Sequence, residues 1–125
     1  MNKLLVILFF IPVFAFAQKK DYKNFDKAVQ YNIEGNIDKS IKYANKALEN
    51  TPDWSQPLLL LASIYVNSNQ IELAASYLLK VYNENDIKDL KGIEQIVKLY
   101  YSNGFYNKAL FYAEQYLLRI QIKSD

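Results

Sequence analysis

The sequence predicts an all-α protein: an α-solenoid of three helix-turn-helix repeats, made of six antiparallel helices. Residues that tolerate a left-handed backbone, Gly35, Asn69 and Gly104, recur 34 and 35 positions apart between helix-like runs. Equivalent positions around these three residues hold similar side chains. No segment has the alternating polarity of a regular strand. Together these observations favour one helical hairpin repeated along the chain.

The repeated positions indicate how each pair of helices packs. Small residues at the eighth and twentieth positions of the repeat let two helices approach closely, and a tyrosine stands at the eleventh position. The eighth position holds Ala28, Ala62 and Val97, the eleventh Tyr31, Tyr65 and Tyr100, and the twentieth Ser40, Ala74 and Ala109. We expect the large residues to fill the layer around the small contact.

Local signals place the helix ends. The expected helices cover residues 21–34, 37–50, 55–67, 71–83, 89–102 and 105–122. Residues 50–53 contain a proline and predict a turn. Ser55 is a candidate N-cap of the third helix, and Asp86 or Asp89 of the fifth. Gly92, near the start of the fifth helix, costs about 1 kcal/mol against alanine, and we attribute it to close packing.

The third expected helix carries no charge. The seventeen residues 55–71 contain no Asp, Glu, Lys or Arg, which raises the alternative of a membrane span. Polar residues interrupt the segment, and it keeps the register of the repeat. A central repeat covered on both sides explains it better.

The first seventeen residues have the pattern of a secretory signal peptide. Lys3 precedes an apolar run over 4–16, which ends in Ala15-Phe16-Ala17. We expect cleavage after Ala17, because thirteen helical residues reach about 20 Å and a bilayer core needs roughly 30 Å. The organisation is then a signal peptide, 1–17, and a repeat domain, 18–125, with repeats at about 21–54, 55–88 and 90–123. The protein is expected in the periplasm or cell envelope, or secreted, with no integral span after cleavage.

Composition excludes most catalytic chemistry. The 125 residues include no Cys and no His, so thiolate nucleophiles, thiolate metal sites and the commonest general base are ruled out. The net charge of +2 is too small for electrostatic binding of nucleic acid. Glu34 and Asp38 are separated by a helix turn, and no nucleophile motif or phosphate-binding loop is present. We therefore expect no enzyme, no catalytic or metal-ligating residues and no cofactor.

The first repeat resembles the tetratricopeptide repeat, a helix-turn-helix unit of 34 residues. The matching residues are Ala28, Tyr31, Gly35, Asn36, Ile37, Ile41, Ala47, Leu48 and Pro52. The resemblance extends over residues 21–122, but the fourth position, usually a large aromatic, is Asn24, Leu58 and Ile93.

The resemblance implies a concave groove lined by the first helix of each repeat. Its lining would be Tyr22, Phe25, Val29, Ile33, Gln56, Leu59, Ser63, Val66, Asn67, Lys91, Glu94, Lys98 and Tyr101. One subgroup of the family clamps a terminal carboxylate with Lys and Asn where this chain has Phe25 and Val29, so that activity is not expected. A peptide with apolar anchors fits better.

The last expected helix is apolar on more than one face. Leu110, Ala113, Leu117 and Ile120 form a candidate interface, and no polar capping helix follows them in the sequence. We expect self-association, as a homodimer, or docking of a protein partner. The sequence thus favours a non-enzymatic scaffold or adaptor that binds a protein or peptide; the alternative is a structural homo-oligomer assembled through the last helix.

Overall fold

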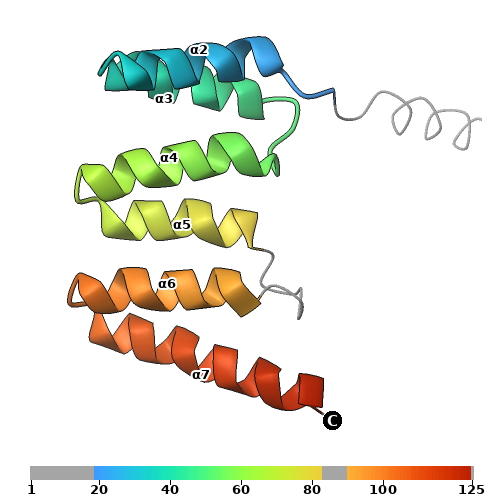
Figure 1. Ribbon diagram of the computed structural model, residues 1–125, viewed down its shortest axis with the longest axis vertical. Coiled ribbons are helices and arrows are strands. Elements are labelled where there is room, and N and C mark those ends of the chain that lie inside the picture. Colours follow the sequence, from blue (N-terminus) through green and yellow to red (C-terminus); the bar gives the residue numbers. More distant parts are fainter. Residues whose placement is uncertain (1–18, 83–89, 125) are drawn as a thin grey trace, which may run out of the picture. The chain divides into compact units, whose positions relative to one another are not determined.

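The computed structural model describes residues 19–82 and 90–124, and the regular structure in these ranges is helical (Figure 1). The helices are α2 (Tyr22–Ile33), α3 (Ile37–Leu48), α4 (Ser55–Asn67), α5 (Ile71–Val81), α6 (Leu90–Ser102) and α7 (Tyr106–Ser124). The prediction of an all-α fold is confirmed. The predicted signal peptide and the cap candidates Asp86 and Asp89 lie outside the described residues.

The chain divides into two compact units, one ending at Pro52 and the other beginning at Asp53. In the first unit, α2 pairs with α3 as a hairpin. In the second unit, α4 pairs with α5 and α6 pairs with α7, and α6 also packs against α5 (Figure 1). This pairing agrees with the expected helix-turn-helix units.

The turn inside each hairpin has the same conformation. The backbone φ angle is positive at Gly35 (81°), Asn69 (61°) and Gly104 (84°). The amide after each of these residues donates a hydrogen bond to the carbonyl of the repeated tyrosine five positions earlier. The bonds run from Asn36 to Tyr31 (2.8 Å), from Gln70 to Tyr65 (2.8 Å) and from Phe105 to Tyr100 (2.9 Å). This is the Schellman pattern, which satisfies carbonyls at the end of a helix.

Small residues separate the paired helices. Ala28, Ala74 and Ala109 are buried, and the Ser40 hydroxyl is buried as well and donates a hydrogen bond to the Ala28 carbonyl at 2.7 Å. Val97, the largest member of this set, is only half-buried. Each hairpin therefore buries at least one of these small residues.

The expected cap of the third helix is wrong. Trp54, not Ser55, is the cap residue of α4, and its side chain makes no capping hydrogen bond. Pro57 explains why a polar cap matters less here, because a proline in the first turn removes one of the amides that would need a partner. By contrast, Asp21 caps α2 by accepting a hydrogen bond from the Asn24 amide at 3.0 Å.

Candidate functional site

The side chains expected to line a groove all lie on the first helix of a hairpin. Four are on α2 in the first unit, and the others are on α4 and α6 in the second unit. Phe25 and Val29 are half-buried. The rest are exposed, and among the large apolar ones the exposed fraction runs from 38% at Val66 to 80% at Ile33. The exposed part of each first helix therefore offers side chains for contact.

The α6 part of this set carries an ion pair. Lys98 Nζ lies 2.7 Å from Glu94 Oε1, one helical turn away. The hydrogen bond between the two side chains lowers the pKa of Glu94 and raises the pKa of Lys98. Both groups are exposed, so the pair adds little to stability and stays accessible to a partner.

The repeated tyrosines form stacked pairs. Each ring at the eleventh position stacks on a tyrosine twelve residues later, in the second helix of the same hairpin. The pairs are Tyr31–Tyr43 (centroids 5.4 Å apart), Tyr65–Tyr77 (5.5 Å) and Tyr100–Tyr112 (5.8 Å), with interplanar angles of 15°, 11° and 12°. Sequence reasoning found the first tyrosine of each pair and missed the second, although the second also recurs 34 and 35 residues apart.

Lysines lie beside these rings. The Tyr43 ring has the Nζ atoms of Lys27, Lys42 and Lys46 at 5.1, 5.9 and 5.2 Å from its centroid. Lys80 lies 5.0 Å from the Tyr77 ring. Cation–π contacts of this kind add to the stability of the stacks within each hairpin.

Two of the stacked tyrosines, Tyr77 and Tyr100, have raised pKa values and are neutral phenols at neutral pH. Burial raises the pKa of Tyr77, and its neighbour Tyr65 adds to the effect. Burial also raises the pKa of Tyr100. A raised pKa leaves less phenolate near pH 7, so neither ring is activated as a general base there.

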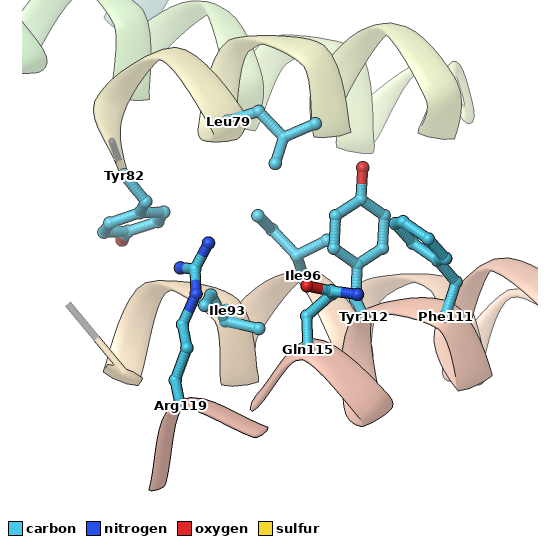
Figure 2. Close-up of a pocket in the computed structure, with 8 residues that line it drawn as sticks. All are labelled: Leu79, Tyr82, Ile93, Ile96, Phe111, Tyr112, Gln115 and Arg119. Carbon is cyan, nitrogen blue, oxygen red and sulfur yellow. The ribbon is translucent and has the colours of Figure 1, made fainter. Parts of the chain in front are cut away.

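An apolar pocket of about 90 Å³ lies between α5, α6 and α7 (Figure 2). It is lined by Leu79, Tyr82, Ile93, Ile96, Phe111, Tyr112, Gln115 and Arg119. Figure 2 shows Leu79 facing Ile96 across the pocket and the Arg119 side chain extending toward Tyr82. The pocket is large enough for an apolar group of about side-chain size, and the Arg119 cation lies at its edge. Nothing in the sequence signalled it, because its lining comes from three helices.

The candidate interface on the last helix is largely exposed. Leu110 is 59% exposed, Leu117 64% and Ile120 38%, while Ala113 is half-buried. Tyr106, which the sequence analysis did not include, is 63% exposed on the same helix. These side chains form an apolar surface on α7.

The described residues contain neither a candidate metal site nor a candidate membrane span. Among them, no group of three or more Asp, Glu, His or Cys side chains is placed to hold a metal ion. In the same part of the chain, no helix combines the length and apolar character needed to span a membrane. No family model matches the chain, and no curated protein shows significant similarity to it. The fold and these surfaces therefore define the class: an all-α protein of helical hairpins.

Proposed function

We propose that the chain is a non-enzymatic protein-interaction scaffold, an α-solenoid of three tetratricopeptide-like repeats. The observation that carries this proposal is the recurrence of one hairpin design. A positive-φ turn, a hydrogen bond to a tyrosine carbonyl, a small helix contact and a stacked tyrosine pair occur together in each hairpin. Units of this kind stack on their neighbours and present an extended surface to a partner.

The proposed binding surface is formed by the first helices of the repeats. Tyr22, Ile33, Leu59 and Val66 provide exposed apolar contacts, and α6 provides the Glu94–Lys98 pair beside the exposed Tyr101 ring. A peptide that carries both apolar anchors and polar groups complements the side chains that these helices expose.

A peptide-binding measurement tests the proposal. Leu59→Ala and Ile33→Ala together should lower the affinity for a captured peptide by about tenfold or more, because anchor side chains contribute about 1–2 kcal/mol each to binding. Leu73→Ala, on the second helix of a repeat and as exposed as Leu59, is the matched control and should bind like the wild type. Unchanged affinity in the double variant would contradict the groove.

We further propose that the protein is exported to the bacterial periplasm or cell envelope, on the strength of the signal-peptide pattern over residues 1–17. N-terminal sequencing of the protein from an expressing cell should begin at Gln18. A full-length chain recovered from the cytoplasm would contradict export.

The alternative function is a structural homo-oligomer assembled through the last helix. It is favoured by the exposed leucines of α7, since a contiguous apolar surface usually marks an interface. An assembly that grows with concentration and captures no other protein would favour this alternative over an adaptor.

A further inference from the structure

Four exposed apolar residues of α7 and the half-buried Ala113 follow a heptad pattern, whereas the exposed Phe111, Leu118 and Ile122 lie off it. Tyr106, Leu110, Ala113, Leu117 and Ile120, called here the α7 seam, are separated by steps of four, three, four and three residues. This spacing places them on one stripe of the helix, as in the contact stripe of a coiled coil. The large side chains of the seam are 38–64% exposed. The seam is therefore suited to receive another helix.

The same stripe on α5 is already covered by a helix. Ile71, Ala75, Leu78 and Tyr82 precede the first four seam residues by 35 positions and have the same spacing. Ile71 and Ala75 are buried in a cluster with residues of α6, and Leu78 and Tyr82 pack against that cluster. Helix α6 runs antiparallel to α5 (Figure 1). Within this chain, then, the stripe binds an antiparallel helix.

The first helix of another copy is a poor occupant of the α7 seam. Helix α6 covers the α5 stripe with side chains that include Ile93 and Ile96, which are buried. The equivalent positions of α2 hold Asn24 and Lys27. A head-to-tail contact would place these polar side chains against an apolar stripe and desolvate them, which is unfavourable.

We propose that the seam binds the same seam of a second copy, with the two α7 helices antiparallel across a two-fold axis. In the register that aligns both seams, Ala113 faces Leu117 of the other copy. Leu110 faces Ile120, and Tyr106 faces Ser124. Two of the three layers pair a small side chain with a large one, so the helices can pack without a gap. A parallel pair would instead oppose Ala113 to itself.

The expected interface is small. Helix α7 has 19 residues and is about 28 Å long. Each large exposed seam side chain supplies roughly 100 Å² per copy. The four large side chains of each copy then give about 800 Å² in total, which lies below the roughly 1,000 Å² of a stable specific interface and in the range of weak, transient ones. We expect a reversible dimer with a Kd in the micromolar range.

Sedimentation equilibrium from about 1 to 200 µM, a range that brackets the expected Kd, tests the pairing. The wild-type chain should pass from monomer to dimer. Leu110→Glu and Leu117→Glu should stay monomeric, with a helical circular-dichroism spectrum like that of the wild type. Leu118→Glu is the matched control, because Leu118 is also exposed (52%) on α7 but lies off the seam. A wild-type monomer at the highest concentration, or an equal effect of the control, would overturn the proposal.

Disulfide trapping tests the register, since the chain contains no cysteine. Ala113→Cys and Leu117→Cys are made separately, mixed and oxidised. An antiparallel dimer should give mainly mixed disulfides, because these two positions face each other at bonding distance. Mass spectrometry separates mixed from self-paired products. Self-paired products alone, or no disulfide in a chain that sediments as a dimer, would refute the register.

The seam is independent of the peptide groove. The groove substitutions Leu59→Ala and Ile33→Ala lie on α4 and α2, so they change peptide binding without altering any residue of the seam. The double variant should dimerise like the wild type, and a loss of dimer in it would count against the assignment to α7. Failure of one proposal is therefore distinguishable from failure of the other.

Discussion

Gly92 shows how one residue fixes a packing contact. A Cβ atom at this position would lie 2.6 Å from the Cβ of Tyr82 and would overlap its ring atoms as well. The absence of a side chain lets Tyr82 lie against the start of α6, where its hydroxyl donates a hydrogen bond to Gln95 Oε1 at 2.7 Å. The sequence suggested close packing at Gly92 but could not name the partner, which comes from another helix.

Gly92→Ala should therefore lower the free energy of unfolding by about 1–3 kcal/mol. The overlap with Tyr82 outweighs a gain in helix propensity of up to about 1 kcal/mol. Urea unfolding measures the change. In a Tyr82→Gly background, which removes the Cβ as well as the ring, the overlap is gone, and the same substitution should be neutral or stabilising. Destabilisation in both backgrounds would rule out the Tyr82 contact as the cause.

The positive-φ turns differ in strain. No atom lies within 4 Å of a Cβ built at Gly35, so its only cost is conformational. Gly35→Ala should destabilise the protein by about 1 kcal/mol. Asn69→Gly relieves the strain already present at φ 61° and should stabilise by several tenths of a kcal/mol. Thermal unfolding should show a lower melting temperature for Gly35→Ala and a higher one for Asn69→Gly. Equal shifts in one direction would contradict the turn geometry.

The raised pKa values of Tyr77 and Tyr100 predict a loss of stability in alkali. Below about pH 10 both folded and unfolded states hold the phenol proton, so stability is unaffected. Above that pH the unfolded chain ionises first, and stability falls as pH rises. Tyr77→Phe and Tyr100→Phe should flatten this fall in urea unfolding between about pH 9 and 11. Tyr101→Phe, which removes an exposed hydroxyl, is the control.

At the scale of elements, local chemistry made the helices predictable. Each hairpin has its own turn residue, Gly35, Asn69 or Gly104, and its own small residues where the two helices meet. These residues act within their own hairpin, and all of them are visible in the sequence. The Ser55 cap was wrong because α4 already begins at Ser55, so the cap position falls on Trp54, whose side chain makes no capping hydrogen bond. The stacked partner tyrosines were missed because they follow from side-chain geometry rather than from backbone preference.

The pairing of α7 predicts an effect of Glu114. This residue flanks the seam, and in the proposed register its counterpart in the second copy lies about 3 Å away along the axis. Two like charges at this separation weaken association. Glu114→Gln should therefore tighten the dimer by up to about twofold in sedimentation, by analogy with like-charge pairs on helices. Glu94→Gln, on α6, is the control, and a weaker dimer in Glu114→Gln would contradict the register.

At the scale of the whole molecule, the two units differ in what they bury. The second unit contains a cluster that includes Ile71, Ile96 and Tyr100. The first unit buries chiefly small side chains, among them Ala28 and Ser40, in two helices of 12 residues each. Short helices without a large apolar contact are marginal in water.

A fragment of residues 53–125 should accordingly unfold cooperatively on heating, while a fragment of residues 18–52 should be mostly unfolded. Circular dichroism of both fragments is the measurement. A cooperative transition in the shorter fragment, or none in the longer one, would show that burial within each unit does not determine its stability.

The candidate surfaces were predictable only in part. The exposed positions of α6 and α7 follow from helical periodicity, so Lys98, Leu110 and Leu117 could be placed from the sequence. The pocket beside Arg119 could not be placed, because its walls come from helices separated in sequence. Sequence periodicity identifies faces, whereas a pocket depends on how those faces meet.

The stacked tyrosines also constrain how the length of the chain can change during evolution. The two rings of every stack are twelve residues apart, whereas the gap from one stack to the next is 22 residues after Tyr43 and 23 after Tyr77. The added residue thus lies between hairpins and leaves each stack intact. An insertion inside a hairpin would rotate one ring by about 100° away from its partner. Length variants of this protein should therefore gain or lose residues between hairpins and keep the twelve-residue separation.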